Sequence, residues 1–460
     1  MTAPVKFSNA SRNDHDTVPL HAESGKTGQS ADNKFRLLRG CWLFVMILLL
    51  IVIALALVFD RNLCRSKRSH NSIMEDESSR VEGGISDVIS ETKEAADGFR
   101  IVCYYVIQSN NTRSRILPPH SLDPYYCTHI IIGFSAIENG TLQPQNDDYL
   151  DVYKKVIALK KVNPSLKVLL SVEDMSSYGE FSRMISTDLH RTTFIKNAIS
   201  FLNKTGFDGI DLDWEFPSWP DADLNQVKNF SLLIAELRQY VSKEAQHMLL
   251  SAAVAAPDLI IQQSYEVGEL AKYLDFVSIM SYDYHMFSEF LPLTGPNAPL
   301  YPRDQELGYM RTLNADWSAN RWLELGMPRK KINVGIPTYG HSFRLTNENN
   351  NGWNAPASGF GYTGTDGFTS YPDACKFLKD RKTNHNFDDS YQVPYAYNGN
   401  EWISYENELS VKLKAMYVKE KRFGGAMIYS LNSDDFYGEC GAKKFVLTRT
   451  VNDILTSDDG

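Results

Sequence analysis

The sequence has little of several features that mark common classes of protein. Its 460 residues carry a formal net charge of −9. They show no basic stripe and no aromatic signature of an RNA-binding module, so we do not expect nucleic acid as a partner. The ten histidines form no H-x-x-x-H or similar spacing, and we expect no metal and no cofactor. Cysteine is also scarce, with six in the whole chain.

Long hydrophobic runs are scarce as well, and one stands out. Cys41–Phe59 contains no charge, and as a helix it would span about 28 Å, enough for the hydrocarbon layer of a bilayer. We therefore predict one transmembrane helix, with the lipid bilayer as its partner. A cleaved signal peptide is the alternative, because Ala54–Ala56 resembles a cleavage site, but the preceding residues 1–40 are polar and the run is long for such a peptide. We expect residues 1–40 to form a disordered cytosolic tail and residues 60–97 a stalk.

Cysteines and sequons indicate on which side of the membrane the rest of the chain lies. Four cysteines outside the hydrophobic run form an even set that could make two disulfides in an oxidising compartment, with three possible pairings. They are Cys103, Cys127, Cys375 and Cys440. N-x-S/T sequons that predict N-glycosylation begin at Asn110, Asn139, Asn203 and Asn229. Together these features predict a single-pass type II membrane protein whose large domain is lumenal or extracellular.

The acids of the chain are densest in DGIDLDWEFP, from Asp208 to Pro217. Side chains alternate between the two faces of an extended strand, so Asp211, Asp213 and Glu215 share one face. Crowding raises the proton affinity of at least one of these acids, and in this way a glutamate can stay protonated and act as a general acid. A solvated acidic turn is the alternative, but such turns lack regular apolar spacers. Here the spacers on the opposite face are Ile210, Leu212 and Trp214.

This string resembles the D-x-x-D-x-D-x-E signature of family 18 glycoside hydrolases, the chitinases and chitinase-like lectins. Other segments follow in the order and spacing of that family. The resemblance extends over residues 98–455, the predicted catalytic domain, and leaves the first 97 residues outside it. The matching segments are MSYD at 280–283, GIPTYG at 335–340, NAPASG at 354–359 and GGAMIYSLNSDDF at 424–436.

Short apolar runs recur through this domain and alternate with amphipathic helical candidates. Such alternation favours βα units with buried parallel strands, and eight units close into a (β/α)8 TIM barrel of the α/β class. The runs begin at Ile101, His129, Lys167, Gly209, Met248, Phe276, Ile332 and Gly424. The helical candidates are residues 148–161, 191–204, 224–244, 306–325 and 406–421.

One interval is too long for a barrel loop. About seventy residues separate Ile336 from the helix near Glu406, so this interval must carry structure of its own. The resemblance implies a small α+β insertion after the seventh strand, at about residues 340–403, that forms one wall of a substrate groove. It also implies the disulfides Cys103–Cys127 and Cys375–Cys440.

The resemblance assigns roles to the acids. It implies that Glu215 gives its proton to the glycosidic oxygen, that Asp213 orients the acetamido group of the substrate and that Asp211 supports Asp213. Tyr282 would hydrogen-bond the acetamido carbonyl, whose oxygen attacks the anomeric carbon in place of a carboxylate nucleophile. The predicted activity is hydrolysis of β-1,4-linked N-acetylglucosamine glycans, either chitin or chitooligosaccharides. Further predicted substrate contacts are Tyr104, Phe134, Met280, Asp283, Tyr339 and Tyr429.

Several positions depart from the family pattern. Tyr429 and Gln108 stand where active members carry groove tryptophans, residues 171–175 replace an S-x-G-G-W element, and His341 replaces an arginine. We expect His341 to be a loop histidine with its hydrogen bonds satisfied. The groove is predicted to have lost its stacking surface, and activity to be weak as a result. The alternative is a membrane-tethered, chitinase-like lectin with little turnover, but such lectins usually replace the acid that Glu215 retains.

Overall fold

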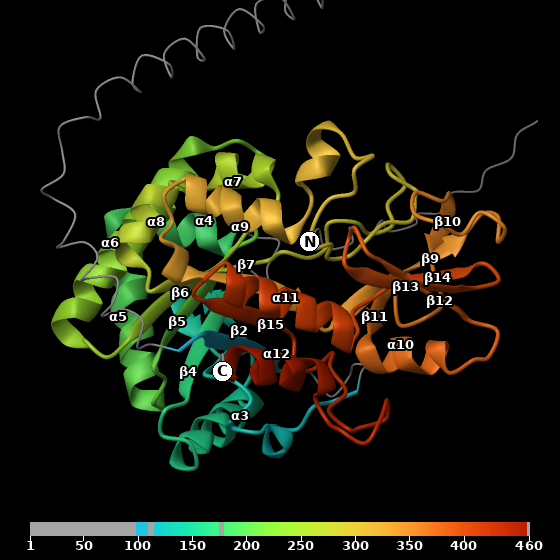
Figure 1. Ribbon diagram of the computed structural model, residues 1–460. Helices are drawn as coiled ribbons and strands as arrows, with labels where there is room; N and C mark the ends of the chain where they lie inside the picture. Colours follow the sequence, from blue (N-terminus) through green and yellow to red (C-terminus); the bar gives the residue numbers. More distant parts are fainter. Residues whose placement is uncertain (1–97, 109–114, 174–178, 458–460) are drawn as a thin grey trace, which may run out of the picture. The chain divides into compact units, whose positions relative to one another are not determined.

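Eight parallel strands close into a barrel in the computed structural model, which describes residues 98–108, 115–173 and 179–457 (Figure 1). The first strand pairs with both the second and the last, and this closes the ring. Each predicted apolar run forms one of these strands, so the predicted barrel is confirmed. The strands are β1 (Arg100–Val106), β2 (His129–Glu138), β4 (Lys167–Glu173), β5 (Gly209–Asp213), β6 (Leu249–Val254), β7 (Phe276–Ile279), β8 (Ile332–Pro337) and β15 (Gly425–Tyr429). The short strand β3 (Thr141–Gln143) pairs antiparallel with β2.

Helices pack around the outside of the barrel. They are α3 (Asp148–Ile157), α4 (Glu180–Ile185), α5 (Asp188–Thr205), α6 (Leu224–Glu244), α7 (Asp258–Ser264), α8 (Val267–Tyr273), α9 (Ala315–Glu324), α11 (Glu408–Glu420) and α12 (Val446–Thr456). The helix predicted at 306–325 was too long, because the side chain of Asn314 accepts a hydrogen bond from the backbone N–H of Trp317 and so starts α9 at Ala315. Before it, Gly308–Thr312 forms a separate 3₁₀ turn.

The strand that carries the acids is held from outside by aromatic packing. Ile210 and Leu212 are buried in the core between the barrel and its helices. Trp214, just beyond β5, stacks on Phe181 of α4 with ring centroids 5.3 Å apart, and its edge meets Phe230 of α6 at 5.8 Å. Because the apolar residues of β5 face outward, the alternating acids face the barrel interior, as the sequence predicts.

A second sheet with six strands follows the seventh barrel strand (Figure 1). Its core contains Phe343 and Trp402, both fully buried. This is the additional sheet that the family resemblance implies, although its exact domain boundaries stay a prediction. Its elements are β9 (Tyr339–Leu345), β10 (Ala357–Phe360), β11 (Phe368–Ser370), α10 (Tyr371–Leu378), β12 (Asn384–Asp388), β13 (Val393–Asn398) and β14 (Glu401–Ser404).

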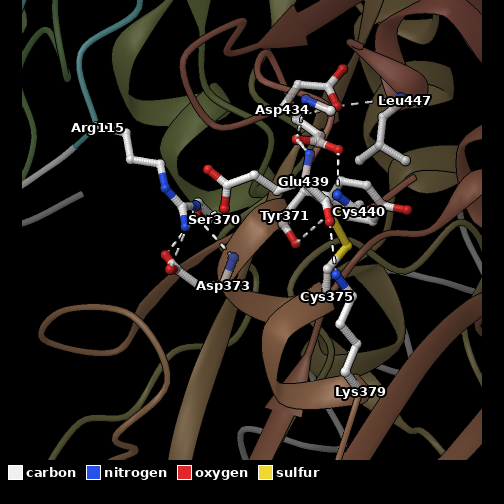
Figure 2. The surroundings of a disulfide bond; sticks show 12 residues. Arg115, Ser370, Tyr371, Asp373, Cys375, Lys379, Asp434, Glu439, Cys440 and Leu447 are labelled. Atoms are coloured by element: carbon white, nitrogen blue, oxygen red, sulfur yellow. Dashed lines mark hydrogen bonds and ion pairs between the residues drawn. A yellow bond between two sulfur atoms is a disulfide. The ribbon is translucent and has the colours of Figure 1, made fainter. Parts of the chain in front are cut away.

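Two disulfides join distant segments of this part of the chain. Cys103 in β1 is bonded to Cys127 just before β2, and Cys375 in α10 is bonded to Cys440 after β15 (Figure 2). These are the pairs that the resemblance implies. Within residues 98–457, apart from the two short gaps, no helix is long and apolar enough to span a bilayer. The predicted anchor Cys41–Phe59 lies outside the described residues, as do the predicted tail and stalk.

Candidate active site

Asp211 lies in the barrel interior and is completely buried. Three hydroxyl groups donate hydrogen bonds to its carboxylate: Tyr104 at 2.7 Å, Ser171 at 2.8 Å and Ser251 at 2.7 Å. Burial raises the pKa of Asp211, and the three hydrogen bonds oppose that rise. Sequence reasoning missed Ser171 and Ser251 as partners, because their donors come from neighbouring strands about 40 residues away in the chain.

Asp213 is the most strongly perturbed of the three acids. Its pKa is raised well above the ordinary value, first by burial and then by the negative charges of Glu215, Glu173 and Asp211. Its Oδ1 atom is buried and has no hydrogen-bond partner among the described residues. The crowding expected from the sequence therefore acts on Asp213, which retains a proton at pH values where a free aspartate has lost it.

Glu215 stands two residues beyond the end of β5 and is half-buried, whereas Asp211 and Asp213 are 0% and 3% exposed. The row of acids therefore runs from the closed interior of the barrel to its open rim. In parallel barrels this rim, at the carboxyl ends of the strands, is where substrates bind. Of the three acids, Glu215 offers the most surface to a ligand.

Buried tyrosines stand beside the acids. The ring of Tyr282 stacks on Tyr429 with centroids 5.8 Å apart, and Tyr429 in turn lies 5.6 Å from Tyr104. The Tyr282 hydroxyl has a weak contact to the sulfur of Met427 at 3.8 Å. Burial raises the pKa of Tyr282 well above its ordinary value, and nearby charges add to the rise. Tyr282 is therefore a neutral phenol that can donate a hydrogen bond to a ligand.

Asp283 is fixed in the groove wall by residues of the second sheet. Its carboxylate accepts a 2.7 Å hydrogen bond from the Tyr339 hydroxyl and lies 2.6 Å from Nε2 of His341. Its backbone N–H donates to the side chain of Asn297 at 2.9 Å, and its φ of 55° is left-handed. His341 lies in β9 rather than in a loop, so our expectation of a loop histidine was wrong. Its position changes its meaning, because it contacts a predicted substrate-binding acid.

The remaining predicted contacts differ in how much surface they offer. Met280 is half-buried after β7, and Phe134 is largely buried, with its ring centroid 6.5 Å from that of Tyr104. Tyr104 is only 1% exposed, and its hydroxyl is used by Asp211. Tyr104 therefore supports the acids from below and has almost no surface for direct contact with a substrate. This corrects its prediction as a binding residue.

Asp208 has a structural role, as its phase in the motif predicts. Its carboxylate accepts a 2.8 Å hydrogen bond from the backbone of Val168 at the entry to β4, and it pairs with Lys160 at 2.8 Å. These contacts hold the end of β5 that is remote from the acids.

The predicted glycosylation sites lie in different environments. Asn139 is exposed in the turn between β2 and β3, and Asn203 is exposed in the last turn of α5. Asn229 is half-buried in α6, and Asn110 lies outside the described residues.

A cavity of about 820 Å³ adjoins the acid site. It is lined by the ends of β1 and β15, including Gln108 and Tyr429, and by residues 362–380 of the insertion. Tyr429 is shared between this cavity and the tyrosines around the acids. The volume falls within the range typical of ligand sites in proteins.

Comparison with known proteins agrees with this geometry. The sequence profile of the glycosyl hydrolases family 18 matches residues 100–434. The chain belongs to this family. Chitotriosidase-1 of Mus musculus is 38% identical over 371 residues, which are 77% of this chain and 78% of that protein. Chitinase-3-like protein 2 of Homo sapiens is 35% identical over 380 residues, covering 79% of this chain and 94% of that protein.

Solved structures of this glycosyl hydrolase family share the fold. A structure of YKL-39 in the presence of chitooligosaccharides (GlcNAc4) matches with a TM-score of 0.73 and 34% identity, covering 78% of this chain and all of that one. A Group IV chitinase of Ostrinia furnacalis matches with the same TM-score and coverage at 32% identity. Human YKL-39 is described as a pseudo-chitinase with retained chitooligosaccharide binding, so the family contains both enzymes and binding proteins.

Proposed function

We propose that the chain hydrolyses β-1,4-linked N-acetylglucosamine glycans, with Glu215 as general acid and base. The observation that carries this proposal is the row of acids on β5. Asp211 is fixed by three hydroxyl donors, Asp213 holds a buried and unpartnered oxygen, and Glu215 stands half-open at the rim. A binding protein would have no need for two buried carboxyl groups aligned beneath a third.

The arrangement suits a reaction in which the substrate supplies the nucleophile. Glu215 donates its proton to the glycosidic oxygen as the bond to the anomeric carbon breaks, and the N-acetyl carbonyl oxygen of the same sugar bonds to that carbon. The free oxygen of Asp213 can accept the acetamido N–H, and the Tyr282 hydroxyl can donate to the carbonyl. Water then opens the ring from the face that the leaving group occupied, giving its proton to Glu215, so the configuration is retained.

The alternative is a lectin that binds these glycans with little turnover. Tyr429 and His341 depart from the enzyme pattern, and the related human YKL-39 is a pseudo-chitinase. Retention of Glu215 favours the enzyme, because loss of the acid is the simplest route to a lectin.

A substitution of the proposed acid separates the two functions. We expect Glu215→Gln in the full chain to lower release of a chromogenic group from a chitotriose conjugate at least roughly 100-fold, the scale of general acid catalysis. Glu348→Gln, at an exposed site, should leave the rate unchanged. Equal rates for the Glu215→Gln variant and the parent would refute the assignment. Saturable binding by a parent that yields no product would establish the lectin.

We also propose that the chain is a type II membrane protein anchored by Cys41–Phe59. Support comes from the charge-free apolar run and from the two disulfides of the folded part, since disulfides persist in oxidising compartments. Alkaline extraction of membranes that carry the full chain should leave it in the pellet. Protease added to intact cells or vesicles will then determine which side the folded part occupies.

A further inference from the structure

The cavity beside the acids contains an aromatic side chain at a place where sugar could stack. Phe368, the first residue of β11, lines the cavity together with Tyr429. One face of its ring stacks on Tyr339 with centroids 4.7 Å apart and an interplanar angle of 20°. The side chain nevertheless remains 38% exposed. Phe368 therefore presents a fixed apolar surface to the cavity.

Phe368 is continuous with the acid site through other rings. Tyr339, on which it stacks, donates its hydroxyl proton to Asp283 and meets the edge of Tyr282 at 5.9 Å. Tyr282 in turn stacks on Tyr429. A glycan whose cleaved sugar lies against Tyr282 and Tyr429 has the cavity, and thus Phe368, directly next to it.

The turn that carries Phe368 is held rigidly before any ligand binds. The buried carboxylate of Glu401 accepts hydrogen bonds from the backbone N–H groups of Tyr362 and Thr363 at 2.7 to 2.9 Å. Gly367 adopts a φ of 83°, which an L side chain rarely adopts, and its carbonyl accepts a bond from the backbone of Ser342 at 2.8 Å. A surface fixed in this way loses little conformational entropy when a sugar packs on it.

The opposite wall of the cavity is polar and equally fixed. The side-chain amide of Asn432 makes two hydrogen bonds with the backbone of Val106, at 2.8 and 2.9 Å. It also donates to the side chain of Gln108 at 3.4 Å. At the outer end, Arg115 pairs with Glu439 at 2.8 Å and lies 3.9 Å from Asp373 (Figure 2). Amides and hydroxyls opposite an aromatic face are the groups that a neutral pyranose requires.

We infer that this cavity is a subsite for an N-acetylglucosamine residue beyond the cleaved bond, and that the sugar stacks on Phe368 of the insertion. This inference rests on the proposed function and adds a residue that determines preference for longer glycans. The platform stands on the wall of the groove opposite Gln108, where the first barrel loop offers an amide instead of an aromatic ring.

Oligomers of different length test the assignment in the full chain carrying Glu215→Gln, which excludes turnover. We expect Phe368→Ala to weaken calorimetric binding of the pentamer roughly 5- to 10-fold, the scale of one lost stacking contact. Binding of the dimer, which needs only the sugars next to the acids, should change less than twofold. Phe368→Trp should preserve the preference for the pentamer. The matched control is Phe360→Ala, because Phe360 is an exposed ring of the same hairpin that does not line the cavity.

The outcomes distinguish this inference from the proposed function. If the pentamer keeps its affinity in Phe368→Ala, the subsite is wrong and the proposed hydrolase stands. Equal weakening of dimer and pentamer would also overturn the subsite, because it would indicate general damage to the groove. If the parent binds no oligomer of any length, the proposed function fails together with the subsite. A loss confined to the longer glycan, absent in Phe360→Ala, supports the inference.

Discussion

Glu173 lies opposite Asp213 in the parallel register of β4 and β5. Its negative charge, with burial and the charge of Glu215, helps to raise the pKa of Asp213 well above the ordinary value. Glu173 belongs to the segment that departs from the family pattern, and it puts a further carboxylate next to the proposed catalytic row. The protonation of that row is therefore set partly by a residue outside the D-x-x-D-x-D-x-E string.

We predict that Glu173→Gln stabilises the protein at neutral pH but not in acid. A raised pKa means that the folded state binds the proton of Asp213 more tightly than the unfolded state. Stability is therefore lost as pH rises from the unfolded pKa, about 3.9, through the folded one. Removing the charge of Glu173 lowers the pKa of Asp213 and reduces that loss. We expect a gain on the order of 1 kcal/mol, or roughly 2 °C in melting temperature, at pH 7 to 8.

Thermal unfolding of the parent and the Glu173→Gln variant between pH 4 and pH 8 checks this. Glu348→Gln, which removes an exposed carboxylate far from the row, controls for net charge. A gain of the same size at every pH would show that Glu173 acts by packing and not through Asp213.

Ser251→Ala should destabilise the protein, because it removes one of three donors to the buried Asp211. We expect a loss of about 1 to 3 kcal/mol, the usual result when a buried acceptor loses a partner. The hydrogen bond lowers the pKa of Asp211, so its removal raises that pKa further. The loss should therefore be larger at pH 8 than at pH 4. Denaturant unfolding at the two pH values measures it.

Ser278→Ala is the matched control for this loss. Ser278 lies in the neighbouring barrel strand β7 and is completely buried, but its hydroxyl has no hydrogen-bond partner among the described residues. Its removal should cost little. Similar losses for the two serines would mean that burial of the hydroxyl, and not its bond to Asp211, determines the effect.

Lys414 and Glu406 form an ion pair that is almost completely buried under the barrel rim, with Nζ 2.6 and 2.7 Å from the two carboxylate oxygens. Burial lowers the pKa of Lys414 and raises that of Glu406. Lys414→Met leaves a buried carboxylate without its cation, and we expect it to cost about 3 to 5 kcal/mol. The double variant with Glu406→Leu should recover most of this in a chemical unfolding experiment. A double variant less stable than Lys414→Met would contradict the account.

The sequence determines the barrel well because its signals are local. Each buried strand is a short apolar run between turns, and alternation within β5 alone orients the acids. Phe368 could not be found in this way. It reaches the groove because β11 pairs with β9, which sets Phe368 opposite His341, 27 positions earlier in the chain. The comparison of groove tryptophans position by position predicted a lost stacking surface, since it considers replacement at the same place and not from another element.

The start of α9 shows the same limit on a smaller scale. Apolar residues from Leu307 onward suggested one long helix, but the side chain of Asn314 caps a shorter one. A cap depends on the dihedral angles of a single residue, which amphipathic periodicity does not report.

Glycan attachment should differ among the predicted sequons if the folded part enters the secretory pathway. Asn139 is exposed in a tight turn, with a φ of 50°, so its side chain is accessible to a modifying enzyme. Asn229 is half-buried within α6, and Ser231 of the same sequon is buried with its hydroxyl bonded to the carbonyl of Val227. We expect Asn139→Gln to remove one glycan from the secreted or surface-expressed chain, and Asn229→Gln to remove none. Peptide mass spectrometry before and after enzymatic deglycosylation measures this. A modified Asn229 beside an unmodified Asn139 would show that attachment precedes folding of α6, so that accessibility in the final structure does not decide it.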